Sequence, residues 1–409
     1  MKHKLYKLTA ALLLALLLVS AASAAGGDGT AENPYVIQTP AELQSMQNDL
    51  SAYYVLANDI DMSGFDFVPI GSSSNPATTA FHGSLDGNGH TIRNLNIDLP
   101  STQYVGLFAV ITAGATIRDL NFADCTISGG ANTGTLYGRC IGISGVSTPF
   151  TITDVDLTDC SITASGSYSG GLGGADASAA VGTISYCDVK NCTVTSASYN
   201  VGGLLGYGSF SGAKVDIEYC TSMHNEIDAA SHSVGGLLGY GSYSGGSECT
   251  VTNCEIGYCY VTSASTNVGG LLGHGSASGG YSEIESNHVH DCVIESSASY
   301  SVGGLLGSGS NSGGSECYVR ENAVENCVMT ASYRVGGLLG SGSSSGGLTE
   351  IDGNAVENCT VKARNSYAGG IAGCYYASGF GNITDCTVSN TTVQASSYAG
   401  GICSTFART

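Results

Sequence analysis

Tryptophan is absent from this 409-residue sequence, proline occurs only 6 times, and charged residues make up only 11% of the chain. The 13 Lys and Arg residues are outnumbered by 33 Asp and Glu residues, which gives a formal net charge of −20. So few basic side chains argue against nucleic acid and anionic lipid as partners. Abundant Val, Ile and Leu allow a buried core and exclude a disordered composition. The 60 glycines and many serines replace the usual charged surface, which suits closely packed extended chains.

Residues 1–24 have the pattern of a secretory signal peptide. Three lysines, Lys2, Lys4 and Lys7, precede an apolar run that ends near Val19, and Ala22-Ser23-Ala24 offers a small-x-small cleavage site. This run is too short to favour a transmembrane helix, and no other stretch is apolar enough to span a bilayer. The C-terminus shows neither a hydrophobic tail nor a sorting signal. We therefore predict a secreted, extracellular protein that begins near Ala25 and has no membrane span after signal removal.

One phrase, VGGLLG, dominates the rest of the chain. Perfect copies are spaced 33, 34, 34 and 33 residues apart, and degenerate copies flank them. A fixed period of this size indicates stacked units, none of which can bury its apolar face alone. The perfect copies begin at Val201, Val234, Val268, Val302 and Val335, and the degenerate ones at Val105, Thr133, Ser169, Ala368 and Ala399.

The repeats are rich in Gly, Ser, Thr, Val and Cys, which are poor helix formers, so the units are predicted to be β. We expect three strands in each unit: the VGGLLG phrase, a strand like Glu248–Val251 and a strand like Cys259–Thr262. A Gly/Ser loop such as 206–212 links the first two. Asn or Asp repeatedly precedes the third strand and suits a left-handed corner. These corner residues are Asp124, Asp159, Asn191, Asp291, Asn326 and Asn358.

Together these features predict an all-β protein, a right-handed parallel β-helix of about ten rungs at about 4.8 Å each. Residues 105–409 form its repeats. Residues 25–104 are predicted to form an N-terminal cap and irregular first rungs, with strands in 53–60 and 81–97. Thr39, Pro40 and Glu42 are typical of a helix start, so a short helix is expected over 41–50.

The 16 cysteines all lie between Cys125 and Cys403, and alignment of the repeats puts most of them in register. Equivalent residues on adjacent rungs lie within disulfide range, and export favours oxidation, so inter-rung disulfides are predicted; the alternative is a buried column of thiols. The first column holds Cys125, Cys160, Cys192, Asn225, Cys259, Cys292, Cys327, Cys359 and Thr391. The second column holds Cys187, Cys220, Cys254, Asn287, Asn322, Asn354 and Cys386.

Two further sets of residues recur with the repeat. Tyrosines precede the glycine pair at Tyr104, Tyr168, Tyr199, Tyr300, Tyr333, Tyr367 and Tyr398, and their rings could bind sugars or simply stack on one another. The glycine pairs lack side chains where another backbone could approach, and we predict that they form a solvent-exposed assembly face. These glycines are Gly202, Gly203, Gly235, Gly236, Gly269, Gly270, Gly303, Gly304, Gly336 and Gly337.

Residues suited to catalysis are scarce. Asp86-Gly87-Asn88-Gly89-His90 has the composition of a turn. His288 and His290 alternate as metal ligands would, but they occur in one repeat and no further ligand column accompanies them. Paired carboxylates do not recur on one face as a polysaccharide hydrolase or lyase would need. We therefore predict that the protein is not an enzyme and has no catalytic residue, cofactor or metal.

The VGGLLG phrase and its period resemble the GLUG-motif repeats of exported microbial surface proteins. The segments 33–37, 58–61, 69–71 and 81–92 resemble the usual N-terminal region of that family. The signal peptide, the Gly/Ala/Ser/Val richness and the many cysteines are also similar to the sheath proteins of filament-forming methanogenic archaea. That resemblance implies stacked, amyloid-like β-arches in a rigid extracellular tube.

The sequence thus leads to one main hypothesis and one alternative. The main hypothesis is a structural subunit of an extracellular sheath or cell-envelope layer, whose partners are copies of itself and possibly other envelope proteins. Such an assembly would grow by strand pairing at the end of the last repeat, which stops within its first strand after Ala399–Cys403. The alternative is a secreted adhesin that binds carbohydrate or protein through the tyrosine face.

Overall fold

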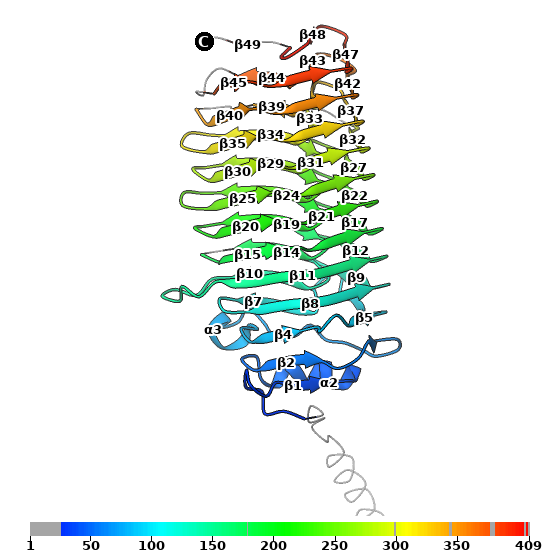
Figure 1. The fold of residues 1–409 in the computed structure, drawn as a ribbon, viewed down its shortest axis with the longest axis vertical. Coiled ribbons are helices and arrows are strands. Elements are labelled where there is room, and N and C mark those ends of the chain that lie inside the picture. The colour runs from blue at the N-terminus through cyan, green and yellow to red at the C-terminus, as the bar shows by residue number, and fades with distance from the viewer. Residues whose placement is uncertain are drawn as a thin grey trace, which may run out of the picture.

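The computed structural model describes residues 26–177, 179–297, 300–342, 346–376, 381–404 and 406–407, so the predicted signal peptide lies outside the described residues. The chain forms a parallel β-solenoid in which about ten turns are stacked along one axis (Figure 1). Strands of successive turns pair into four sheets of 21, 10, 10 and 8 strands. None of the helices in this part of the chain combines the length and apolar character needed to cross a bilayer.

A representative turn contains five strands. They are β23 (Val234–Gly235), β24 (Leu238–Tyr243), β25 (Glu248–Thr252), β26 (Glu255–Gly257) and β27 (Tyr260–Ser263). Each pairs in parallel with its equivalent in the next turn. Those partners are β28 (Val268–Gly269), β29 (Leu272–Ala277), β30 (Tyr281–Glu285), β31 (His288–His290) and β32 (Val293–Ser296).

The prediction of three strands per unit is wrong in two respects. The VGGLLG phrase is not one strand, because the chain turns between Gly235 and Leu238 and contributes to two different sheets. The expected Gly/Ser loop is mostly strand: β19 (Leu205–Phe210) and β24 run through it. Ser209 and Ser242 in these segments are buried, and Ser242 Oγ lies 3.0 Å from Ser282 Oγ of the next turn. Stacking supplies the burial and the hydrogen bonds that make this polar segment extended, and a single repeat does not reveal either.

Aliphatic side chains form columns along the axis of the solenoid. In the sheet that contains β27, the inward position is aliphatic in turn after turn, and its residues are fully buried. Burying each such side chain contributes about 1.5–3 kcal/mol relative to leaving it exposed. This column includes Ile162, Val194, Ile227, Val261 and Ile294.

The left-handed corners predicted from Asn and Asp are confirmed. All six predicted residues have φ between 52° and 55°. The same corner is occupied in two turns by His224 and Tyr258, with φ of 57° and 55°. Side chains of this size pay about 1–2 kcal/mol in the left-handed region, so they are held there by the pairing of the turns on either side.

The N-terminal segment begins with β1 (Tyr35–Ile37), followed by α2 (Pro40–Ser45), a 3₁₀ turn (Met46–Asn48) and β2 (Tyr53–Leu56). The predicted helix start is confirmed, although the helix is shorter than expected. Thr39 Oγ1 accepts a hydrogen bond from the Glu42 amide, and Glu42 Oε2 accepts one from the Gln38 amide. Leu43 and Met46 are fully buried at this end of the stack. The strands expected in 53–60 and 81–97 are broken into β2, β3 (Ile60–Asp61), β4 (Ser84–Asp86), β5 (Thr91–Arg93) and β6 (Asn96–Asp98).

The predicted assembly-face glycines lie inside the molecule, so the prediction of a solvent-exposed face is wrong. All ten are buried, and a Cβ on any of them would lie well under 3.0 Å from a backbone oxygen of this same chain. For the second glycine of each pair, that oxygen belongs to the equivalent glycine of the next turn. The glycines therefore set how closely successive turns approach at this corner, because any side chain would push the turns apart.

This geometry predicts a strong effect of Gly236→Ala on the isolated monomer. The added methyl would collide with the carbonyl of Gly270, which is backbone and cannot rotate away. We expect a loss of about 1–3 kcal/mol in the free energy of unfolding, measured by urea denaturation. Gly245→Ala is the matched control, because a Cβ there meets nothing within 4 Å, and it should change stability by less than about 0.5 kcal/mol. Equal effects of the two substitutions would contradict the close-approach argument.

Candidate functional site

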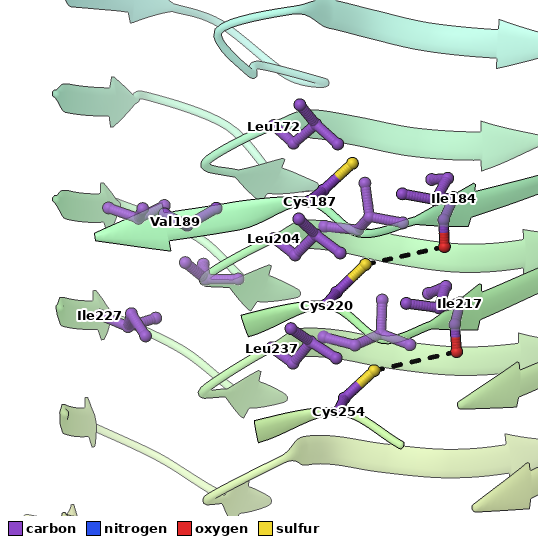
Figure 2. Packing of buried hydrophobic residues seen from close by; sticks show 14 of the residues in the cluster. Leu172, Ile184, Cys187, Val189, Leu204, Ile217, Cys220, Ile227, Leu237 and Cys254 are labelled. Carbon is purple, nitrogen blue, oxygen red and sulfur yellow. Dashed lines mark hydrogen bonds between the residues drawn. The ribbon is translucent and has the colours of Figure 1, made fainter. Parts of the chain in front are cut away.

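The two predicted cysteine columns are in register along the solenoid. The carbonyl of every column residue except the last of each column accepts a hydrogen bond from an amide of the following turn. For example, the amide of Ser161 donates to Cys125, and the amide of Thr193 donates to Cys160. Figure 2 shows Cys187, Cys220 and Cys254 of the second column, from successive turns, with their sulfur atoms among buried leucines and isoleucines. None of the fifteen cysteines with described side chains is joined in a disulfide, and thirteen of them are buried.

Cysteine and asparagine occupy the same column because both satisfy the same buried backbone groups. The amide of Cys254 donates to Asn287 Oδ1 at 2.9 Å, and the amide of Cys259 donates to Cys292 Sγ at 3.4 Å. The column side chain also donates inward: Asn287 Nδ2 to the Val251 carbonyl at 2.9 Å, and Cys254 Sγ to the Ile217 carbonyl at 3.9 Å. A column residue must therefore offer both an acceptor and a donor, because an unpaired buried amide costs about 1–3 kcal/mol.

Asparagines continue the second column as a chain of amides. Asn287 Nδ2 donates to Asn322 Oδ1 at 2.9 Å, and Asn322 Nδ2 donates to Asn354 Oδ1 at 2.9 Å. The amides of Asn287 and Asn322 donate to the same two oxygens, also at 2.9 Å. The asparagines of this column therefore stabilise the stack by linking successive turns.

Two cysteines outside both columns have strongly shifted acidity. Burial raises the pKa of the Cys317 thiol to about 12, and burial likewise raises the pKa of Cys249. Cys249 pairs with Val215 and Ser282 in the adjacent turns, and Cys317 pairs with Ser282 and Thr349. Neither therefore has a cysteine in register in an adjacent turn. Their burial and high pKa mark them as structural thiols with little nucleophilic character.

The tyrosines that precede the glycine pair form two adjacent columns instead of the single one expected. Tyr367 pairs with Tyr398 in one adjacent turn and with Arg334 in the other. Tyr333 precedes Arg334 by one residue and therefore lies in a different column from Tyr367. Tyr300 and Tyr333 lie in the neighbouring column, where their rings stack at 4.9 Å. Alignment by the glycine pair alone missed this shift of one residue, which sequence reasoning could have found by counting back from the repeated valine.

An aromatic groove lies where these tyrosines meet Tyr207 and Phe210. It has a volume of about 270 Å³, and Tyr104, Arg139, Tyr168, Tyr207 and Phe210 contribute to its lining. The Arg139 guanidinium lies 5.7 Å from the centre of the Tyr104 ring, and its Nη1 donates to the Tyr104 hydroxyl at 3.2 Å. Aromatic faces beside a guanidinium are suited to bind sugar rings and their acidic substituents.

A buried carboxyl group, Asp176, lies at the same level of the stack. It sits in an inward column with Cys140 and Ile111 and accepts a hydrogen bond from the Tyr137 hydroxyl at 2.9 Å. Its other oxygen has no partner among the described residues. Complete burial raises the pKa of Asp176 well above its ordinary value, so the carboxyl group is held in its neutral form. Sequence reasoning missed this residue, although an aspartate in a column of apolar side chains was a detectable signal.

The residues singled out near the N-terminus form the expected turn. Asn88 and Gly89 have φ of 51° and 76°, and Asp86 Oδ1 accepts a hydrogen bond from the Asn88 amide at 2.8 Å. Asp86 also pairs with Arg118 at 2.6 Å. These contacts occupy the carboxylate and hold the turn against the next rung.

The chain matches no protein-family model. It is 35% identical to halomucin of Haloquadratum walsbyi over 128 residues, which is 28% of this chain and 1% of halomucin. It is also 35% identical over 135 residues to a protein of Evansella cellulosilytica described as a Gly-rich membrane protein, covering 29% of this chain and 15% of that protein. The chain thus spans a small part of the length of both relatives, and the similarity is to surface-type proteins.

Solved structures with a similar arrangement are distant. A proposed immunoglobulin A1 protease of Bacteroides ovatus has 20% identity and a TM-score of 0.43, with 75% of this chain and 78% of that chain covered. The A-module of a mannuronan C-5 epimerase of Azotobacter vinelandii has 11% identity and a TM-score of 0.34, with 93% and 99% covered. Scores this low transfer no activity, substrate or site.

Inter-turn disulfides stay a prediction, and peptide mapping without reductant tests them. In exported protein we expect links between neighbours in a column, such as Cys259–Cys292, Cys327–Cys359 or Cys187–Cys220, because adjacent turns bring their sulfurs together. Cys249 and Cys317 serve as internal controls, since they should be recovered as thiols that react only after unfolding. Recovery of every cysteine as a thiol from unreduced material would instead favour the hydrogen-bonded thiol ladder.

A pH-dependent effect is predicted for Asp176→Asn. The wild-type carboxyl binds its proton more tightly when folded than when unfolded, where its pKa is near 3.8, so stability is lost as pH rises above about 4. The variant avoids this loss and can still accept from Tyr137. We expect its free energy of unfolding to exceed that of the wild type at pH 7, with the difference vanishing near pH 4.

Proposed function

We propose that this protein is a structural subunit of an extracellular sheath or cell-envelope layer, which assembles with copies of itself through β-sheet edges and faces. The observation that carries the proposal is the uninterrupted stack of turns, whose aliphatic, amide and thiol columns all continue from one turn to the next. Such in-register columns favour continued stacking, as in other self-assembling β structures.

Apolar side chains of the last described turn are less covered than their equivalents in the turn before it. Val361 is fully buried, whereas Val393, its equivalent in the last described turn, is only partly buried. Val388 and Cys386 are likewise partly buried. A turn from a second molecule placed on this end would cover these side chains and pair with the strand edges that lie beside them.

A secreted adhesin is the second candidate function, and the aromatic groove favours it. Tyr168 and Tyr207 pack edge to face at 5.6 Å beside Arg139, so the groove presents both aromatic surface and positive charge. This arrangement suits an acidic carbohydrate better than a neutral aliphatic ligand. The two functions differ in whether the purified protein polymerises.

Assembly is tested by electron microscopy and sedimentation of the mature protein. We expect ordered hoops, sheets or tubes, and we expect Val393→Lys to block growth by placing a charge in the turn that a second copy must cover. Thr392→Lys is the matched control, because its exposed side chain does not face the core and should leave assembly unchanged. Circular dichroism of both variants confirms that the monomer remains folded.

The other outcomes separate the alternatives. Wild-type protein that stays monomeric at all concentrations would overturn the structural proposal. If that monomer binds acidic polysaccharide and Tyr168→Ala abolishes binding, the adhesin function is supported instead. Polymers that Val393→Lys leaves intact would exclude growth through this end and indicate lateral association of whole solenoids.

A further inference from the structure

His288 and His290 lie on β31, and both side chains face outward from the largest sheet. Their rings are 4.8 Å apart, and the His290 side chain is only 12% exposed. His288 Nε2 is shielded from solvent and has no hydrogen-bond partner, since the nearest carboxylate oxygen, on Glu325, is 3.6 Å away. A buried nitrogen without a partner indicates that this pair is arranged for something beyond packing.

The adjacent turns supply carboxylates to the same place. Glu255 pairs with His288 in the preceding turn, and Glu325 pairs with His290 in the following one. His290 Nε2 lies 3.0 Å from Glu255 Oε1. One ligand atom each from Glu255, His288 and His290 lie within 4.8 Å of one another. Three protein ligands at such separations can close on a tetrahedral ion, whose ligands lie about 3.3 Å apart for bonds of about 2.0 Å.

Asp291 orients His290 as the outer carboxylate of a metal site does. Its Oδ2 lies 2.9 Å from His290 Nδ1, so the Nδ1–H donates to it and the Nε2 lone pair points toward Glu255. A neutral imidazole has only one N–H and cannot donate to both carboxylates. A cation between Nε2 and Glu255 Oε1 satisfies both groups.

The repeat is altered beneath this cluster. Gly257 pairs with His290, and a Cβ at Gly257 would lie 2.6 Å from His290 Nε2. The position of Gly257 is occupied by Met223 in the preceding turn. It is occupied by His290 in the following turn and by Glu325 in the turn after that. Ala323, a small residue, pairs with His288. The absence of a side chain at Gly257 lets the imidazole of His290 lie across the sheet toward Glu255.

We propose that Glu255, His288 and His290 form a binding site for a Zn²⁺-like divalent transition metal, with Glu325 able to approach as a further ligand. Two imidazoles with carboxylate oxygen suit zinc and its neighbours, whereas calcium and magnesium prefer oxygen ligands alone. The ion would join two consecutive turns on the outer surface. This site is independent of the assembly proposed above, because its ligands all come from one chain.

Zinc titration of the mature protein, followed by calorimetry and thermal unfolding, tests the site. We expect the protein to bind one equivalent of zinc saturably and its Tm to rise on binding. Either His290→Ala or His288→Ala should abolish both effects. Gly257→Ala should weaken binding while keeping every ligand. His232→Ala is the control, since that ring stacks on Tyr199 away from the cluster.

Asp291→Asn provides the sharpest comparison. Asn already occupies this left-handed corner at Asn191, Asn326 and Asn358, so the substitution suits the backbone and removes only the charge that orients His290. We expect about a 10- to 100-fold loss of zinc affinity. Asp159→Asn makes the same change at the same corner in another turn and should leave affinity unchanged.

X-ray absorption of the zinc-loaded protein separates this site from the cysteines. Nitrogen and oxygen ligands at about 2.0–2.1 Å, with the pattern of imidazole, are expected, whereas thiolate ligation gives bonds of about 2.3 Å. Sulfur ligation, or affinity that survives both histidine substitutions, would overturn the proposal. Absence of saturable binding would show that His290 forms only an ion pair with Glu255.

Discussion

The hydrogen bonding of buried backbone groups at the corners is the constraint on which this structure depends. In a stack of parallel turns, each inward amide at a corner faces the next turn, and only a side chain from that turn can reach it. Asn287 accepts from the Cys254 amide and donates inward, and thiols such as Cys292 do the same with longer, weaker bonds. The cysteine thiol in this protein is therefore a structural alternative to asparagine, and the columns tolerate either residue without a change in the path of the chain.

Close approach of the turns is the second requirement, and it explains the richness in glycine. The paired glycines bring one turn against the next without intervening side chains, while aliphatic columns fill the interior beside them. A rod built in this way has few charges to bury and needs no helix in its repeats. It also repeats the same backbone path in every turn.

Two residues differ from their equivalents in neighbouring turns in ways that stacking of the turns does not require. Asp176 interrupts an inward apolar column beside the aromatic groove, and Gly257 interrupts a column of side chains beneath His290. In both cases a single residue differs from its equivalents in neighbouring turns, and a polar or ionisable group nearby lacks a partner. Selection for a regular rod alone would remove such residues, because an unpartnered buried group lowers stability.

The sequence by itself determined the repeat, its β character, the left-handed Asn and Asp corners and the register of the cysteine columns, because each depends on local conformation or on a constant period. Only the tertiary structure decided where the strands break, that the Gly/Ser segments are extended, and that the glycine pairs face the chain's own next turn. It also brought together Glu255, His288 and Glu325, which are about one period apart and occur once. Such contacts depend on which side chains face the same surface in adjacent turns, and a single turn read along the chain contains neither the neighbouring turn nor its burial.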